Sequence, residues 1–346
     1  MKGRIAVLGE VGGKRAAALI VDGLLDDFLI DTDDDKIPAP GAIFRAICDR
    51  PLKGLGGMML RLPGGTGFLR GASGLRPGQP LLVQVTGYSE PGKAVPVTSR
   101  LLFKSKYAIV TPEAPGINVS RAIKDEEMRV RLLEIAHEIG GDDPSFGLIV
   151  RSEAERASNE DIANDITDMA ELATAVMGDT VGSEPELLVE GVDAHTLAWR
   201  EWGQVETVAD APNAFEDFGV LEMIDSLLAP RMGLAGGGYC YIEPTRALVA
   251  VDVNTGGDTS PAAGLKANIA TARLLPAQLR SRGLGGQITI DFAPMAKKDR
   301  RQLEQVLKTA FRGDAIETAF AGWTPLGHFE LQRKRERLPL HEILTL

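Results

Sequence analysis

The sequence has little of several residue types, and each shortage narrows what the protein can be. Its 346 residues include only two cysteines, Cys48 and Cys240. They lie far apart and form no C-x-x-C pair, so neither a zinc site nor a disulfide framework is indicated. No uninterrupted apolar run is long enough to cross a bilayer, and the N-terminus interrupts its apolar runs with charge and glycine, unlike a secretory signal. We therefore expect a cytoplasmic protein with no membrane partner.

Basic charge is scarce overall but concentrated in two segments. The formal net charge is −10. Residues 38–105 carry nine Lys and Arg against two Asp and Glu, and residues 266–337 carry fourteen against seven. Residues 153–230 carry two basic against nineteen acidic side chains. This separation favours an oriented surface for a polyanion such as nucleic acid, although either basic segment could also be ordinary solvated surface.

Two short apolar segments each end on an aspartate. Residues 247–253, ALVAVDV, and 287–292, QITIDF, are rich in β-branched side chains and bounded by Gly and Pro, so both are predicted strands. If the strands are neighbours, Asp252 and Asp291 form an oxygen site of the kind that Mg²⁺ prefers, and phosphoryl chemistry commonly uses such sites. The alternative is that Asp252 and Asn254 only begin a turn.

Local patterns predict further elements. Residues 4–9 and 16–22 should form a hairpin over a Gly-Gly turn, and DEEMRVRLLEIAHEIG should form an amphipathic helix that ends at Gly140-Gly141. After Pro294, five apolar residues at helical spacing predict a helix with one buried face. These residues are Leu303, Val306, Leu307, Ala310 and Phe311.

Two longer stretches, GGYCYIEPTRALVAVDVNTG and LRSRGLGGQITIDF, resemble the signature of the ribonuclease E/G family. The resemblance implies that Asp252 and Asp291 bind a catalytic Mg²⁺ and that Asn254 orients the first of them. It also implies an endoribonuclease that hydrolyses single-stranded RNA in RNA processing or decay. Because water rather than the 2′-hydroxyl would attack, the products would carry 5′-phosphate and 3′-hydroxyl ends.

The resemblance also implies a fold, which we expect to be a multi-domain α/β architecture. An RNase H-like scaffold would comprise residues 1–37 and 106–230, the second part carrying the 5′-end sensor. Residues 38–105, where short strands alternate with Gly and Pro turns, would form an inserted S1 domain, a β-barrel of the OB type. A DNase I-like catalytic domain would comprise residues 231–346.

Four residues are expected to contact RNA because they fall on the family pattern. Phe68 and Lys93 match RNA-contact positions of the S1 domain, where bases stack on aromatics and cations hold phosphates. Arg280 and Arg282 belong to the matching helix before QITIDF. Phe68 could instead be a core residue and Lys93 an ordinary turn lysine. The only aromatic residues of segment 38–105 are Phe44, Phe68, Tyr88 and Phe103, so we expect this barrel to hold RNA more weakly or with a different distribution of contacts.

A pocket for the 5′-monophosphate of the RNA is also implied. Its matching residues are Arg151 and Ser152, at the end of the strand GLIVRS, with Arg121 upstream. Arginine offers a planar fork of donors to a phosphate, and serine keeps a hydroxyl donor. The alternative for Arg151 is a surface arginine at the end of a strand.

Two other functions are compatible with the sequence. One is an RNA-binding protein of this fold without useful catalysis, and the other is a Mg²⁺-dependent DNase or phosphatase supported only by the two carboxylates. The sequence also resembles a short form of the family, without the C-x-x-C zinc link and small domain of its large members. We therefore expect no zinc-linked dimer, and the oligomeric state stays open.

Overall fold

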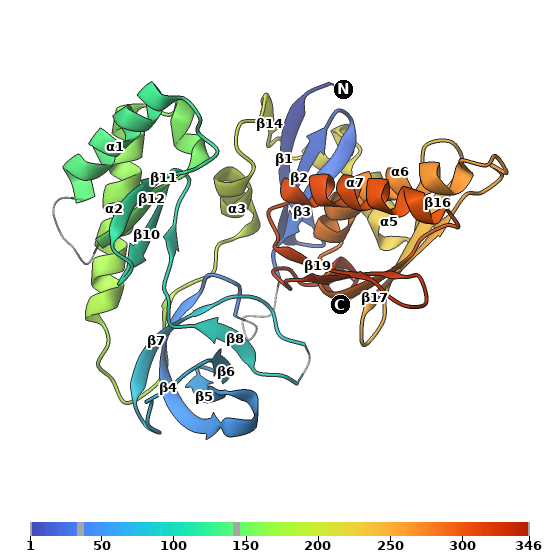
Figure 1. The fold of residues 1–346 in the computed structure, drawn as a ribbon. Coiled ribbons are helices and arrows are strands. Elements are labelled where there is room, and N and C mark those ends of the chain that lie inside the picture. The colour runs from blue at the N-terminus through green and yellow to red at the C-terminus, as the bar shows by residue number, and fades with distance from the viewer. Residues whose placement is uncertain (1, 33–37, 91, 141–145, 345–346) are drawn as a thin grey trace. The chain divides into compact units, whose positions relative to one another are not determined.

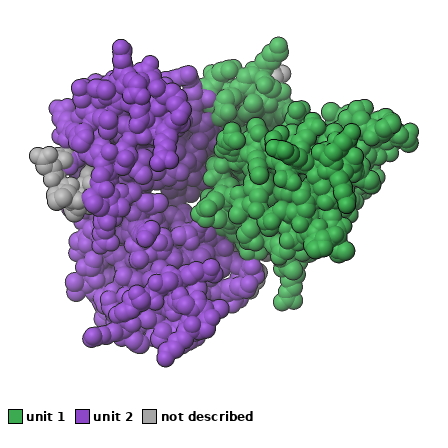
Figure 2. All heavy atoms as spheres, in the orientation of Figure 1, with its two compact units in different colours: residues 1–32, 205–346 green, residues 33–204 purple. Residues whose placement is uncertain are grey.

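The predicted strands form four sheets in a computed structural model that describes residues 2–32, 38–90, 92–140 and 146–344. The chain divides into two compact units, Met1–Thr32 with Val205–Leu346, and Asp33–Gln204. Figure 2 shows the first unit in green and the second in purple. Among the described residues, none of the helices combines the length and the apolar character needed to span a bilayer.

The first unit contains a six-stranded sheet in which almost all neighbours are antiparallel. Only β17 and β18 are parallel, and they are joined by the crossover helix α6 (Ala263–Ser281), as a parallel pair requires. The strand order is β15 (Arg231–Gly233), β16 (Tyr239–Pro244), β17 (Val249–Asn254), β18 (Gly286–Asp291), β20 (Phe329–Arg333) and β19 (Thr318–Trp323).

Two helices bury one face of this sheet (Figure 1). Helix α6 and helix α7 (Arg300–Arg312), which follows the short turn η3 (Lys297–Asp299), contribute their apolar stripes to the core. In α7 the predicted stripe is confirmed, because Leu303, Leu307 and Phe311 are buried. The opposite face of the sheet carries the polar members of each alternating strand, including both candidate aspartates.

A second sheet of the same unit contains the predicted N-terminal hairpin. Its order is β14 (Thr207–Ala209), β1 (Arg4–Val11), β2 (Lys14–Val21) and β3 (Leu24–Ile30). Ile5, Val7, Ala18 and Ile20 pack into one core with the helices around this sheet. These helices are α4 (Ala214–Asp217), α5 (Val220–Leu228) and α8 (Leu340–Leu344).

The second unit contains a closed barrel, which confirms the predicted small β-barrel of the OB-like kind (Figure 1). Its strands follow the order β4, β5, β6, β8 and β7, and β4 pairs with β7 to close it. Strand β13 (Glu186–Val189) pairs antiparallel with the first residues of β4 and is not one of the five strands that close the barrel. The barrel elements are β4 (Ile43–Leu52), η1 (Lys53–Leu55), β5 (Gly57–Leu62), β6 (Gly65–Arg70), β7 (Pro80–Val85) and β8 (Val95–Thr98). Cys48 is buried in its core.

The other sheet of this unit has the order β11, β12, β10 and β9, and it packs against the predicted helix α1 (Glu126–Gly140) and against α2 (Asn159–Gly178). Gly141 of the predicted helix end lies outside the described residues. The remaining elements are β9 (Phe103–Lys104), β10 (Ala108–Pro112), β11 (Gly116–Val119), β12 (Phe146–Val150), η2 (Ser152–Arg156) and α3 (Ala194–Glu201).

The contacts group the chain into two units, whereas the sequence suggested four segments. The N-terminal hairpin shares a sheet with β14, and the strands between 103 and 150 form a sheet of their own. The predicted domain boundaries stay predictions, as does the likeness of these parts to RNase H and DNase I folds. The mixed α/β class with an OB-like barrel is what the structure establishes.

Candidate functional site

Asp252 and Asp291 are direct register partners on the parallel strands β17 and β18. Alternation along each strand explains why both side chains point to the open face. Val251 and Ile290, the preceding residues, are 1% and 0% exposed in the core, so the next side chain on each strand points outward. Both aspartates are exposed, and the two carboxylates lie side by side at the C-terminal ends of the strands.

Asn254 lies two residues beyond Asp252 and points to the same face. Its amide Nδ2 donates a hydrogen bond to Oδ2 of Asp252 over 2.9 Å. This contact holds one carboxylate oxygen in place, and among the described residues Oδ1 of Asp252 has no hydrogen-bond partner and can take a ligand. The structure thus brings together the three residues that the sequence proposed for catalysis.

His328 is a residue at this site that the sequence reasoning missed. Its Nε2 lies 4.0 Å from Oδ1 of Asp291. It precedes β20, whose Phe329 pairs with Ile290, so the antiparallel register continues to place His328 opposite Asp291. A strand register for GHFELQR could have found this residue, but only after the order of the strands was known.

The two carboxylates have the character of a hard cation site. Neither Asp252 nor Asp291 forms an ion pair with a lysine or arginine in the part of the chain that the structure describes. Within those same ranges, no three His, Cys, Asp or Glu side chains gather into a group that could hold a metal. Two carboxylates without further protein ligands are compatible with Mg²⁺, which keeps several waters and commonly binds one or two carboxylates.

The residues proposed to sense a 5′-phosphate lie in the second unit, around the end of β12. Ser120 donates its backbone N–H to the carbonyl of Val150 over 2.8 Å, which brings the segment of Arg121 beside that of Arg151. Arg121 and Ser152 are exposed. Arg151 is half-buried, and its guanidinium already has partners within the protein.

The main partner of Arg151 is Glu201, the last residue of α3. Arg151 Nη2 and Lys104 Nζ each donate to Glu201 Oε2 over 2.8 Å, and Arg200 Nε donates to Oε1 over 2.6 Å. Three cations therefore surround one carboxylate. We call these four residues the Glu201 cluster.

The Glu201 cluster shifts the pKa of two of its members. Burial by itself would raise the pKa of the Glu201 carboxyl, but the hydrogen bond from Lys104 and the three neighbouring positive charges outweigh it and lower the pKa. Burial, helped by the charges of Arg151 and Arg200, lowers the pKa of Lys104 despite the opposing effect of Glu201. With three cations and one carboxylate, the cluster keeps a net positive charge.

The two barrel residues proposed to contact RNA are accessible. Phe68 on β6 is half-buried, and Lys93 is exposed and forms an ion pair with Glu90 over 2.5 Å. The ring of Phe68 crosses Gly57 of the neighbouring strand, because a Cβ at Gly57 would lie 2.6 Å from Phe68 Cζ. Glycine at this position leaves room for the ring beside the neighbouring strand.

Arg280 and Arg282 lie inside the first unit, with exposed fractions of 8% and 5%. Arg280 pairs with Asp26, Asp27 and Asp314 at 3.0, 3.2 and 2.6 Å. Arg282 donates to the carbonyl of Leu227 in the last turn of α5, where a cation is favourable. Burial lowers the pKa of Arg282 to about 10. A role of these two arginines in RNA binding stays a prediction, and the structure gives them a structural one.

The buried arginines also revise the charge argument from the sequence. Arg333, with 1% exposure, and Arg280 both belong to the basic segment 266–337. In the other basic segment, Arg45 is 8% exposed and pairs with Asp179 and Glu186. Part of the positive charge counted in each segment is therefore neutralised within the protein and cannot attract a polyanion.

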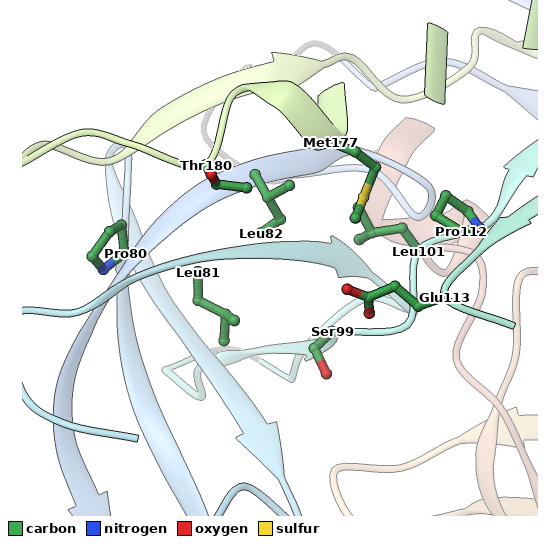
Figure 3. A pocket seen from close by; sticks show the side chains of 9 residues that line it. All are labelled: Pro80, Leu81, Leu82, Ser99, Leu101, Pro112, Glu113, Met177 and Thr180. Carbon is green, nitrogen blue, oxygen red and sulfur yellow. The ribbon is translucent and has the colours of Figure 1, made fainter. Parts of the chain in front are cut away.

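One cavity of about 290 Å³ lies in the second unit, between the barrel strand β7 and the sheet strand β10 (Figure 3). Leucines line much of it, and its charged side chain is that of Glu113. None of the residues proposed from the sequence lines this cavity. It therefore offers neither the cations that a phosphate would need nor a paired acid and base.

The fold and the site together define a class: an α/β protein with an OB-like barrel and an open sheet face that carries two adjacent carboxylates. A comparison with known proteins identifies its family. The model of the family described as "Ribonuclease E/G family" matches residues 103–204 and 194–336. The chain belongs to the ribonuclease E/G family.

Individual relatives agree with this assignment. The chain is 29% identical to a protein named Ribonuclease E from Synechocystis sp. over 363 residues, which is 92% of this chain and 53% of that protein. It is 29% identical to Ribonuclease G of Salmonella typhimurium and 28% identical to that of Escherichia coli, in both cases over 78% of this chain and 62% of the relative. The chain thus spans about half to three fifths of the length of these relatives.

Proposed function

We propose that this protein is a Mg²⁺-dependent endoribonuclease that hydrolyses single-stranded RNA in RNA processing or decay. The observation that carries the proposal is the register pairing of Asp252 with Asp291 at the ends of two parallel strands. Family membership supports RNA as the substrate, because the relatives are named as ribonucleases. The OB-like barrel supports a single-stranded substrate.

The site's own residues have distinct roles in this proposal. Asp252 and Asp291 bind the cation, and Asn254 holds Asp252 in position through its hydrogen bond. When bound, Mg²⁺ lowers the pKa of a water and offsets the charge that develops on the phosphate. Attack of water on phosphorus breaks the bond from phosphorus to the 3′-oxygen, and a proton passes to that oxygen. The products then carry a 5′-phosphate and a 3′-hydroxyl.

The second unit supplies the proposed grip on the substrate. Phe68 stacks on a base, and Lys93 holds a phosphate after exchanging its ion pair with Glu90. The Glu201 cluster binds the terminal 5′-monophosphate through Arg151, with Ser152 and Arg121 beside it, once Glu201 has been displaced. The excess positive charge of the cluster supports this assignment.

The test is cleavage of a short, AU-rich, 3′-labelled single-stranded RNA with Mg²⁺, comparing the wild type, Asp252→Asn and Glu243→Gln. Glu243 is an exposed carboxylate on the neighbouring strand β16, so its variant loses the same charge on the same sheet. We expect internal cleavage by the wild type and by Glu243→Gln, and none by Asp252→Asn. Mass spectrometry of the fragments should show 5′-phosphate ends, whereas 2′,3′-cyclic phosphates made without metal would refute the mechanism.

Two outcomes would favour the other functions considered. If all three proteins bind the RNA but none cuts it, the protein is an RNA-binding member of the family. If a DNA oligomer of matched sequence is cut as fast as the RNA, the activity is that of a less selective nuclease, and the barrel does not select the substrate.

A further inference from the structure

Two tyrosines lie beside the candidate site on the open face of the six-stranded sheet. Strand β16 pairs with β17 so that Tyr241 is opposite Asp252 and Tyr239 is opposite Asn254. The intervening Cys240 is fully buried in the core. Because successive side chains alternate between the two faces, both tyrosines must share the face of the candidate catalytic residues.

These tyrosines form a small cluster with an arginine. The ring centroids of Tyr239 and Tyr241 are 5.7 Å apart, with an edge-to-face angle of 85°. The guanidinium carbon of Arg231, on the adjacent strand β15, lies 4.4 Å from the centroid of the Tyr239 ring. Both tyrosines are half-buried and Arg231 is exposed. We call these three residues the tyrosine platform.

We propose that the tyrosine platform binds the base of a nucleotide next to the bond that is cut. Aromatic faces stack on bases of any sequence, and a nearby arginine adds a cation–π contact and a charge for phosphate. The inference rests on the proposed function, because it is the assignment of Asp252 and Asp291 to phosphodiester cleavage that places an RNA strand on this face.

The spacing of the strands supports this assignment. Neighbouring strands lie about 4.8 Å apart, so Tyr241 is one strand spacing from Asp252. A nucleotide whose phosphate reaches the carboxylate pair must therefore place a sugar or base over an adjacent strand. On the β16 side it meets Tyr241 opposite Asp252 and Tyr239 opposite Asn254, with Arg231 on the next strand, β15. On the other side of the pair it meets His328.

The platform also offsets the electrostatic repulsion between the site and RNA. Asp252 and Asp291 are negatively charged and, without a metal, repel RNA phosphates. Stacking is largely independent of charge, and Arg231 contributes the opposite sign. The platform can hold the strand against the sheet while the carboxylates remain free to bind the cation.

A double-mutant cycle between protein and RNA tests the proposal. One series comprises wild type, Tyr241→Ala and Tyr241→Phe, and the other a single-stranded RNA in which an abasic nucleotide is moved through each position around the cleavage site. Affinity is measured by fluorescence anisotropy in EDTA, so that no cleavage occurs. Circular dichroism and thermal unfolding check that each variant is folded.

We expect Tyr241→Ala to weaken binding of the intact RNA roughly 5- to 150-fold, the range of base–aromatic stacking. Tyr241→Phe, which keeps the ring, should remain within about twofold. At one position the abasic RNA should bind the wild type as weakly as intact RNA binds Tyr241→Ala, and combining both changes should cause no further loss.

The proposal would be overturned if Tyr241→Ala bound RNA as tightly as the wild type. It would also be overturned if the losses of affinity from Tyr241→Ala and from the abasic nucleotide were additive at every position of that nucleotide. A change in oligomeric state with unchanged affinity would mean that the platform contacts protein instead. Failure of the proposed function would be seen in a different experiment, the cleavage assay, in which the wild-type protein would not cut RNA with Mg²⁺. The binding cycle contains no metal and decides about the platform independently.

Discussion

Arg151 donates a hydrogen bond from Nη2 to Oε2 of Glu201 over 2.8 Å. The guanidinium that we propose as a sensor of the 5′-phosphate is thus held by an internal carboxylate. A carboxylate and a phosphate can each accept two hydrogen bonds from the planar guanidinium of arginine, so Glu201 and the 5′ end of an RNA would compete for the same donors.

We predict that Glu201→Gln increases the preference for 5′-monophosphorylated RNA. Removing the negative charge leaves Lys104, Arg151 and Arg200 available to a phosphate, so the ratio of kcat/KM for 5′-monophosphate over 5′-hydroxyl RNA should rise severalfold. The ratio is measured with two otherwise identical oligomers. Glu155→Gln, a change of the same kind on η2, serves as the control and should leave the ratio unchanged. If the ratio is unchanged in Glu201→Gln, the Glu201 cluster does not recognise the 5′ end of the RNA.

The same glutamate should make stability depend on pH. The folded-state pKa of Glu201 lies below its ordinary value of 4.5. Its charged form therefore stabilises the fold fully above the unfolded-state pKa, and this contribution is lost as the pH falls through the folded-state pKa. With a side chain only 20% exposed, we expect Glu201→Gln to cost about 1–3 kcal/mol at pH 7. Urea unfolding of both proteins from pH 7 to pH 3 should show the difference shrinking in acid, and a constant difference would contradict the assignment.

Asp314 should be essential for the stability of the first unit. Its carboxylate accepts from Arg280 over 2.6 Å and from Arg333, and the side chains of Asp314 and Arg333 are 0% exposed. Asp314→Asn leaves the buried guanidinium of Arg333 without its charge partner and removes one of the three carboxylates around Arg280, so it should cost roughly 3–5 kcal/mol in urea unfolding.

The matched control for Asp314 is Glu317→Gln. Glu317 also pairs with a basic residue, Lys334, at 2.6 Å, but its side chain is 72% exposed. Solvent screens that pair, so the variant should unfold almost like the wild type. Equal effects of the two variants would mean that burial does not strengthen the Asp314 contacts.

Phe68 should contribute to RNA affinity through its ring. We predict that Phe68→Ala weakens binding of a single-stranded RNA roughly 5- to 150-fold by anisotropy. Phe68→Leu separates stacking from packing, because leucine still covers Gly57 on the barrel wall but offers no aromatic face. If Phe68→Leu binds like the wild type, the ring serves only to pack the barrel.

The catalytic candidates were predictable because their signals are local. Asp252 and Asp291 each follow a β-branched run, and alternation along the strand places both on one face. The stripe of α7 and the N-terminal hairpin likewise depend on periodicity and turn residues within a few positions. Such patterns are properties of the chain alone.

The sequence by itself therefore determined the two strands that carry the aspartates, the N-terminal hairpin, helices α1 and α7, the small barrel and the identity of the carboxylate pair. Only the tertiary structure decided which charges are satisfied internally and which side chains share a face. Arg280 meets Asp26 across 254 positions, Arg151 meets Glu201 across 50, and His328 reaches Asp291 through a strand register. The physical reason is that long-range partners depend on how strands and helices pack, and composition and periodicity do not encode that arrangement at any one position.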